Sequence, residues 1–411
     1  MMNIKLLEKI QKTAFQFFQD FSNWDESSKG YGLSVDHTNN MKFSSIATTG
    51  FMLSSLIIGV THDYIKREKA LQQARKTLST LYHHASQQFG FFAHYLEMKT
   101  GKRRDQCEYS TIDTALVLCG VISVDSFFHD EEISRLSKLI LDRVDWSKFI
   151  YEKEGKKLLH MSYNPDKDGA YTLGNPGFIH QWDMFAEQLM MYVIIGGSAF
   201  SEQAYDLYHG FTRNKGTYGA YEYIYSPGNT LFVYQFPLAW LDLKDYVDDQ
   251  QISWFENARF ATLAHLSCSI DHHESYHTLT KNFFGFTASD TPKGYRVFSA
   301  LPNDHKELIT DGTVAPFAAI GSLPFTPSES MSSINAMLNI ENLWGKYGFY
   351  DAFNLESKIP WISNRYIGVD KGLEMLMVNA YLSKDVQIAF MNHSLIKKGF
   401  EVLHWEKRNK N

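Results

Sequence analysis

Residues 46–60 read IATTGFMLSSLIIGV, the longest apolar run in the chain. Only the small hydroxyl residues Thr48, Thr49, Ser54 and Ser55 interrupt it. A membrane-spanning helix needs about 20 apolar residues, and this run is shorter. It therefore predicts a helix buried on all sides in a protein core, and a chain with no membrane partner.

Helical spacing continues on both sides of this run. Apolar residues recur at three- and four-residue steps over residues 4–21 and 70–81. Further helices are predicted to begin at Ser110, Asp130 and Thr326-Pro327, and to cover residues 182–195, 254–270 and 369–382, with a shorter one near the C-terminus. Strand signals are confined to residues 218–225 and 294–298. This pattern favours an all-α architecture, either helix pairs closed into an α/α toroid or a helical bundle.

Four long segments join the predicted helices: 151–181, 213–231, 271–311 and 344–368. Loops of this length are uncommon in compact domains unless they are functional or disordered. Their many Tyr, Trp and Gly residues favour order. With no Gly/Ser-rich linker in the sequence, we expect one domain over residues 1–411, with the loops gathered on one face.

Composition narrows the possible partners. The 411 residues carry a formal charge of −6, without the basic stripe that a nucleic-acid partner requires. Three cysteines and no CxxC pair disfavour disulfides and a cysteine zinc site, and favour the cytoplasm. Polar residues interrupt the N-terminal helix, so it does not resemble a signal peptide, although an export signal already removed stays possible. The oligomeric state is left open.

Motifs for phosphate, nucleotide or metal chemistry are absent. The sequence has no GxGxxG, GxxxxGK[ST], HExxH or GxSxG. His265, His272, His273 and His277 fit no standard zinc spacing, so a solvated loop is the favoured interpretation. We expect neither a metal nor a cofactor.

Acidic residues beside aromatic residues and glycines are the strongest chemical signal. An acid in such a segment must be paired, hydrogen-bonded or functional, because an isolated buried charge is costly. Glu187 precedes an apolar stretch whose burial would raise its pKa, as a general acid requires. Simpler roles compete: a helix N-terminal charge for Asp113, a turn for Asp311 and a loop brace for Asp351. The acids are Glu97, Asp113, Asp183, Glu187, Asp311, Asp351 and Asp370.

Several stretches resemble one known family. They are FSSIATTGFMLSSLIIGV, GFFAHYLEMKTGKR, STIDTALVLCGV, RVDW, WDMFAEQLMMY, GFTASD, DGTVAPFAAIGSLPFTP, YGFYDAFN and YIGVDKG, in order from about Thr13 to Phe400. They are similar to the bacterial glycoamylase-like proteins, which include glycoside hydrolase family 144 and the transglycosylase domain of cyclic β-1,2-glucan synthases. The resemblance implies a single (α/α)6 barrel that acts on β-1,2-glucan, by inversion in some members and by retention in others.

The resemblance also implies roles for individual residues. WDMFAE places the general acid at Glu187, and GVDKG makes Asp370 the general base. Glu97, Asp113 and Asp183 would lie in sugar subsites, and Asp311 would be structural or sugar-binding. The position of the nucleophile in retaining members holds Lys281, and a family HQYSHAWID segment is altered from Tyr234 to Asp242. Candidate sugar-stacking residues, each of which could equally be core, are Tyr171, Trp182, Trp240 and Trp361.

We therefore predict an inverting glycoside hydrolase that acts on β-1,2-glucan or a related gluco-oligosaccharide. Such a reaction needs one acid and one base and no metal. A retaining transglycosylase is a second possibility, although an ammonium at Lys281 cannot replace a carboxylate nucleophile. A barrel that binds glucan without cleaving it is a third. A polysaccharide lyase is a distant fourth, because no Arg-rich loop is apparent.

Overall fold

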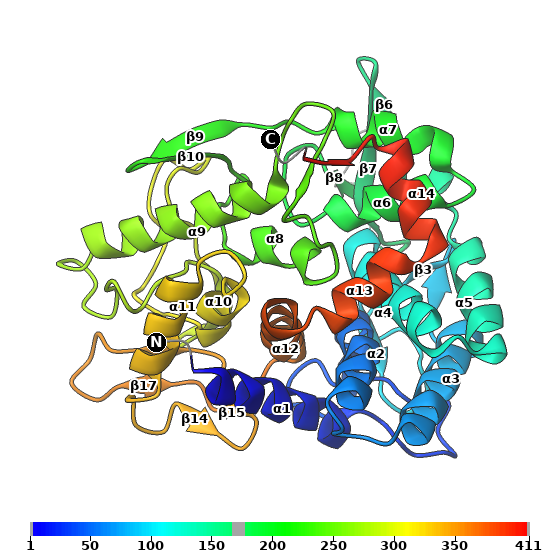
Figure 1. Ribbon diagram of the computed structural model, residues 1–411, viewed down its shortest axis with the longest axis horizontal. Coiled ribbons are helices and arrows are strands. Elements are labelled where there is room, and N and C mark those ends of the chain that lie inside the picture. Colours follow the sequence, from blue (N-terminus) through cyan, green and yellow to red (C-terminus); the bar gives the residue numbers. More distant parts are fainter. Residues whose placement is uncertain (1–2, 167–176, 409–411) are drawn as a thin grey trace.

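The computed structural model describes residues 3–166 and 177–408 and is mostly helical (Figure 1). Its helices are α1 Ile4–Phe21, α2 Ile46–Thr61, α3 Arg67–His83, α4 Thr111–Phe128, α5 Glu131–Arg143, α6 Leu189–Gly197, α7 Ser201–Gly210, α8 Phe232–Gln235, α9 Trp254–Asp271, α10 Pro316–Gly321, α11 Pro327–Met337, α12 Gly368–Leu382, α13 Asp385–Asn392 and α14 Ser394–Val402. Short 3-10 turns cover Trp146–Phe149 and Pro237–Ala239.

Helices α2 and α4 pack closely against each other in the core. A Cβ atom on Gly50 would lie 2.3 Å from the carbonyl oxygen of Leu116, and one on Gly120 would lie 2.4 Å from that of Gly50. Glycine is therefore required at both positions for the backbones to approach so closely. The predicted helix over residues 46–60 is confirmed, and it is buried almost throughout.

Helix starts follow the capping residues that the sequence contains. The Ser110 hydroxyl accepts a hydrogen bond from the Asp113 N–H at the start of α4, and the Asp130 carboxylate accepts one from the Ile133 N–H at the start of α5. Pro327 occupies the first turn of α11, where its missing N–H costs nothing. These three predicted helix starts are confirmed.

Helix α12 lies at the centre of the view in Figure 1 and packs against α1, α2 and α10. It contributes to both apolar clusters of the protein, with Leu373, Leu376 and Met377 in the larger one and Val378 in the smaller one. Both clusters also draw on the N-terminal helix α1. The two ends of the chain are thus packed into the same core.

Among the described residues, only α4 is long and apolar enough to cross a membrane. Most of it is buried inside the molecule, where it packs against α2, α5 and α13. Core helices of this kind are apolar because they are covered by protein on all sides.

Strands are short and lie in the connections between helices. They are β1 Phe43–Ser45, β2 Gln87–Gln88, β3 Phe91–Phe92, β4 Tyr95–Glu97, β5 Tyr109–Ser110, β6 Ile150–Lys153, β7 Lys156–Tyr163, β8 Phe178–Gln181, β9 Lys215–Tyr218, β10 Tyr221–Ile224, β11 Tyr246–Val247, β12 Ala288–Thr291, β13 Gly294–Val297, β14 Trp344–Gly345, β15 Gly348–Phe349, β16 Phe353–Asn354, β17 Trp361–Ile362 and β18 Glu406–Lys407. All their pairings are antiparallel. The predicted hairpin pieces are confirmed as β9–β10 and β12–β13.

The segment predicted as a long loop over residues 151–181 instead contains part of a small sheet. Strand β7 pairs with β5, β6 and β8, and its register joins Tyr109 to Tyr163 and Ile150 to Leu159. The pairing of β7 with β5, about fifty residues away in sequence, carries no local signal, but the adjacent hairpin β6–β7 was missed as well. Tyr171 lies outside the described residues.

The helix predicted over residues 182–195 is wrong in its first half. Helix α6 begins only at Leu189, because residues 182–186 are held extended by distant partners. The Trp182 N–H donates to the carbonyl of Leu159, and Phe185 and Asp183 exchange backbone hydrogen bonds with Thr212. Glu187 therefore lies in a turn just before α6.

Candidate active site

A cavity of about 890 Å³ lies where the N-terminal ends of several helices converge. Side chains from the starts of α2, α4, α10 and α12, and from the turn before α6, line it. Helix N-termini carry unpaired N–H groups and a partial positive charge, so they favour acidic side chains. The acids that line the cavity are Asp36, Asp105, Asp113, Glu187 and Asp370.

Glu187 is held in the cavity wall by its neighbours in the turn. The side chain of Gln188 accepts a hydrogen bond from the Ala186 N–H and donates one to the Met184 carbonyl, while the Phe185 ring stacks on Trp254 at 4.8 Å. Burial raises the pKa of Glu187 to about 7, and the carboxylate of Asp113 adds to the rise. Much of this carboxyl population is protonated at neutral pH, as proton donation requires.

Asp370 lies in the first turn of α12, on the same cavity, and is almost completely buried. Burial raises its pKa well above the usual range, and the neighbouring carboxyl of Asp351 adds to the rise. The hydrogen bond from the Gly368 N–H to the Asp36 carbonyl fixes the start of this helix against the segment that carries Asp36. The turn thus presents Asp370 from a fixed backbone.

A histidine surrounded by carboxylates forms another part of the wall. The His94 ring contacts Glu108 at 2.7 Å and Asp113 at 3.7 Å. Burial alone would lower the pKa of His94, but Asp113, Glu108 and Asp36 raise it to about 9. Burial also raises the pKa of Asp36 to about 6. His94 is therefore a cation at neutral pH, which compensates part of the acidic charge.

Aromatic rings also line the cavity. The Phe43 ring meets that of Tyr95 edge-on at 5.4 Å, and Tyr95 stacks on His94 at 3.9 Å. The Arg104 guanidinium lies 4.8 Å from the centre of the Phe43 ring. Tyr295 lines the cavity from the hairpin β12–β13. Flat apolar rings beside carboxylates suit a ligand with both C–H faces and hydroxyl groups, such as a sugar.

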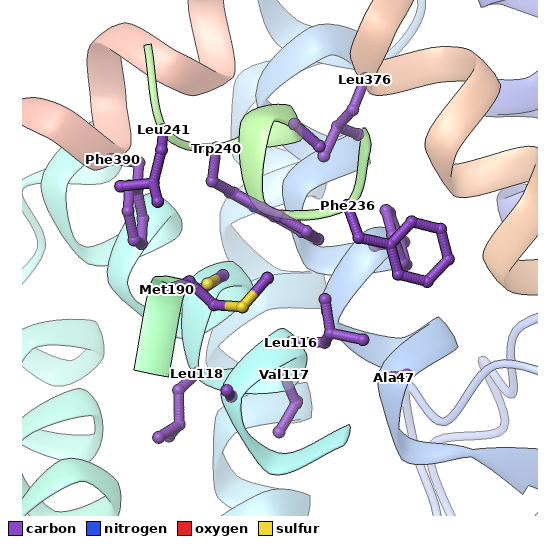
Figure 2. Packing of buried hydrophobic residues seen from close by; sticks show 14 of the residues in the cluster. Ala47, Leu116, Val117, Leu118, Met190, Phe236, Trp240, Leu241, Leu376 and Phe390 are labelled. Atoms are coloured by element: carbon purple, nitrogen blue, oxygen red, sulfur yellow. The ribbon is translucent and has the colours of Figure 1, made fainter. Parts of the chain in front are cut away.

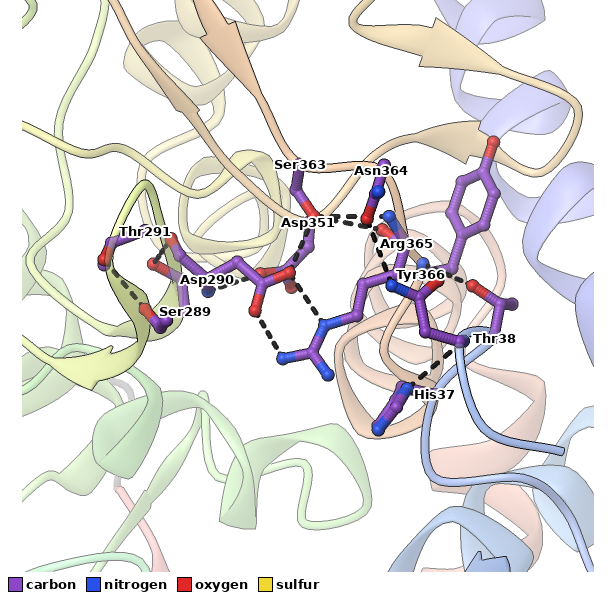
Figure 3. Close-up of polar contacts among 12 residues, drawn as sticks. His37, Thr38, Ser289, Asp290, Thr291, Asp351, Ser363, Asn364, Arg365 and Tyr366 are labelled. Atoms are coloured by element: carbon purple, nitrogen blue, oxygen red, sulfur yellow. Dashed lines mark hydrogen bonds and ion pairs between the residues drawn. The ribbon is translucent and has the colours of Figure 1, made fainter. Parts of the chain in front are cut away.

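The hairpin β12–β13 is tied to the segment before α12 by an ion pair. The Arg365 guanidinium binds both carboxylate oxygens of Asp290, and the Ser363 hydroxyl donates to the same carboxylate at 2.7 Å (Figure 3). Lys281, which could have paired with Asp290, is exposed and does not line the cavity. Asp290 is bound by Arg365 instead.

The structure brings only some of the predicted site residues together. Glu187, Asp370 and Asp113 line the cavity, whereas Glu97 and Asp183 are exposed and lie outside its lining. Asp311 caps its own turn by accepting from the Thr313 N–H at 3.0 Å.

The described tryptophans do not line the cavity. The indole N–H of Trp240 donates to Ser54 and that of Trp182 donates to Thr111, and both rings are buried in the core (Figure 2 shows Trp240). Neither ring has a free face for a sugar. Trp361 is half-buried and lines a neighbouring hollow of about 400 Å³ together with Tyr295.

The residues of this wall that sequence reasoning missed include Asp36, His94, Tyr295 and Arg365. Asp36 follows the buried pair Ser34-Val35, and this acid directly after a buried segment is the signal that could have found it. His94 stood in a quoted motif, but its charge depends on Glu108 and Asp113, which the fold brings to it. Tyr295 and Arg365 carry no local signal.

Comparison with known proteins places the chain in a family. A family model described as putative glucoamylase matches residues 179–394, more than half of the chain. The chain belongs to this putative glucoamylase family. The matched region includes both Glu187 and Asp370.

The likeness to individual relatives and solved structures extends over nearly the whole chain. An exo β-1,2-glucooligosaccharide sophorohydrolase (non-reducing end) of Parabacteroides distasonis is 24% identical over 97% of this chain, which spans 57% of that relative's length. A putative glucoamylase structure from Bacteroides uniformis has a TM-score of 0.85 at 23% identity, covering 99% of this chain and 98% of its own. An endo-β-1,2-glucanase from Chitinophaga pinensis, in complex with sophorotriose and glucose, has a TM-score of 0.83 at 21% identity, covering 99% of each chain. The likeness to the two solved structures shows that this chain shares their fold.

Proposed function

We propose that the protein is a glycoside hydrolase that acts on β-1,2-glucan or its oligosaccharides. The observation that carries the proposal is the cavity itself, in which Glu187, a carboxyl with a pKa of about 7, and the buried Asp370 line one space beside aromatic rings. The hydrolytic activities named for the similar proteins support the choice of β-1,2-linked glucose.

In the proposed reaction Glu187 donates its proton to the glycosidic oxygen as the bond to the anomeric carbon breaks. A water molecule attacks that carbon from the opposite face, and its proton passes to the Asp370 side. This is the inverting reaction, which needs an acid and a base on opposite sides of the sugar ring. The cationic His94 limits the net negative charge around these groups.

We also propose that the paired helices close as one (α/α)6 barrel over the whole chain. The order of contacts α10–α12–α2–α4–α6 supports this arrangement of neighbouring helices, and the likeness to the solved relatives supports the closure. The cavity then lies at the end of the barrel where the N-termini of the inner helices meet.

A retaining transglycosylase is the second candidate. It requires a carboxylate nucleophile about 5–5.5 Å from the acid. Asp113 is the residue that favours this second function, because it lines the cavity and its charge raises the pKa of Glu187.

The experiment that tests the proposal is a panel of β-1,2-, β-1,3-, β-1,4- and α-1,4-glucans, with reducing-end release as the readout. We expect release from the β-1,2-linked substrate above all others. Release from the α-1,4-glucan alone would contradict the proposed substrate. Binding of β-1,2-glucan without any release would instead indicate a non-catalytic glucan-binding protein.

A further inference from the structure

Asp351 and Asp370 are two acids that meet inside the protein. Asp351 lies between strands β15 and β16, and Asp370 lies in the first turn of α12. Their side chains are in hydrogen-bonding contact, and the residues are only 3% and 4% exposed. Burying two like charges side by side is costly unless something neutralises one of them.

Asp351 is anchored by a backbone group. Its Oδ2 atom accepts a hydrogen bond from the Asp290 N–H at 2.7 Å. The Asp290 carboxylate is itself bound by Arg365 and Ser363, as Figure 3 shows. The Asp351 side chain is thereby fixed in position, with its other oxygen left over.

One oxygen on each acid lacks a donor. Asp351 Oδ1 and Asp370 Oδ2 are both buried, and no hydrogen-bond donor reaches either of them from the part of the chain that the structure describes. An ionised carboxylate can only accept hydrogen bonds. The contact between the two carboxyl groups therefore requires a proton on one of them.

The charged groups around the pair do not supply another way to neutralise it. On α12, the Lys371 ammonium is bound by Glu374 and donates to the Phe349 carbonyl at 2.8 Å. Arg365 is committed to Asp290 on β12.

Of the remaining titratable groups, Tyr295 on β13 faces the pair, and Asp36 on the segment before β1 faces Tyr295. A neutral phenol and another acid cannot offset a second negative charge. A shared proton is the only neutralising group left among the described residues.

We propose that Asp351 and Asp370 share one proton between Asp351 Oδ1 and Asp370 Oδ2, so that the pair carries a single negative charge and acts as one base. Asp351 is then a positioning residue, which acts through Asp370. This role rests on the proposed hydrolase function, but the shared proton itself does not.

The electrostatics of the two sites agree with this arrangement. Burial raises the pKa of Asp351 to about 6, whereas that of Asp370 lies well above the usual range. The Asp290 N–H and the Arg365 guanidinium favour negative charge on Asp351. In the resting enzyme the proton therefore lies on Asp370 and is donated to Asp351.

During hydrolysis the pair takes up one proton. The attacking water forms a C–O bond at the anomeric carbon and gives its proton to Asp370. As it does so, the shared proton moves from Asp370 to Asp351. Glu187 gives its proton to the leaving oxygen at the same stage. The pair then holds two protons and Glu187 none, and exchange with solvent restores both.

The test is infrared spectroscopy of the whole protein at pH 7, which separates the C=O stretch of a protonated carboxyl from the bands of carboxylates. The variants are Asp351→Asn, Asp370→Asn and the control Asp311→Asn, whose carboxylate caps a turn. An asparagine at position 351 can accept from the Asp290 N–H and donate to Asp370, so it replaces the shared proton and leaves Asp370 ionised. Because Glu187 is itself partly protonated at this pH, the spectra are compared as differences from the unmodified protein. We expect both pair variants to lose one protonated-carboxyl band that is distinct from that of Glu187, and the control to retain it.

Persistence of that band in Asp351→Asn would overturn the proposal. If either pair variant fails to fold, a pH titration of Glu187→Gln, which lacks the carboxyl band of Glu187, decides instead. The band must persist above pH 7, whereas its loss with an ordinary carboxyl pKa would contradict a shared proton.

Activity provides a separate readout that distinguishes this inference from the proposed function. Asp351→Asn should keep hydrolysis within about tenfold, while Asp351→Leu, which offers no donor, should lower kcat by about 10²-fold or more with little change in KM. Equal losses in the two variants would contradict the positioning role. A protein with the infrared signature but no hydrolysis of any glucan would refute the proposed function and leave the shared proton standing.

Discussion

The surroundings of Glu187 raise its pKa, so that its carboxyl group keeps a proton. Glu187 lies in a turn that follows a segment held extended by two distant parts of the chain. Burial in this position, next to Asp113, raises its pKa to about 7. An ordinary glutamic acid would be ionised at neutral pH and could not donate a proton. The same residue type at Glu97 is exposed and accepts a hydrogen bond from Thr100.

Replacing Glu187 by glutamine tests its role as the acid. The amide keeps the shape of the side chain but cannot donate the proton, so kcat should fall by about 10²–10⁴-fold. Sugar binding, measured by calorimetry, should persist. The matched control is Glu97→Gln, which lies outside the cavity and should leave turnover unchanged. An unaltered kcat in Glu187→Gln would remove this residue from the mechanism.

The starts of helices could be predicted from the sequence, whereas contacts between segments far apart in the sequence could not. Ser110, Asp130 and Pro327 begin helices by contacts within the next few residues, and their helices were predicted correctly. The turn that carries Glu187 depends on Thr212 and Leu159, which no local pattern shows. The positions of Glu187 and Asp370 in one cavity agree with the family resemblance, whereas His94 and Asp351 gain their importance only from partners brought by the fold.

The cap of α4 links stability to the site. The Ser110 hydroxyl satisfies the Asp113 N–H in the turn that carries Asp113 into the cavity. Ser110→Ala should lower the free energy of unfolding by about 1 kcal/mol, as measured by denaturant titration. Ser27→Ala, in an exposed turn, is the control and should change it far less. Equal effects of the two substitutions would argue against the cap.

For the whole molecule, several buried groups hold protons that the unfolded chain would release. Burial raises the pKa of Glu187 and of Asp36, and the carboxylates around His94 raise its pKa to about 9 although burial opposes this. For each group the folded pKa exceeds the unfolded one, so its stabilising contribution is lost as pH rises. The stabilising contributions of the two acids are lost between about pH 4 and 7, and that of His94 is lost between about pH 6.5 and 9.

The free energy of unfolding should therefore fall between pH 5 and pH 9. Urea titrations at constant ionic strength across this range measure it. The variant Glu187→Gln should show a shallower decline below pH 7, because it lacks one of the groups concerned. A stability that rises over this interval would contradict the assigned pKa directions.

Glu187 and the Asp370 side of the cavity should together cleave β-1,2-glucan with inversion. Inversion turns the β-linkage into an α-anomer, because water enters from the face opposite the leaving group. Proton NMR of the first sugar released from a β-1,2-gluco-oligosaccharide, recorded before mutarotation, reads this directly. We predict the α-anomer. A β-anomer would contradict inversion and would require another carboxylate, such as Asp113, to act as a nucleophile.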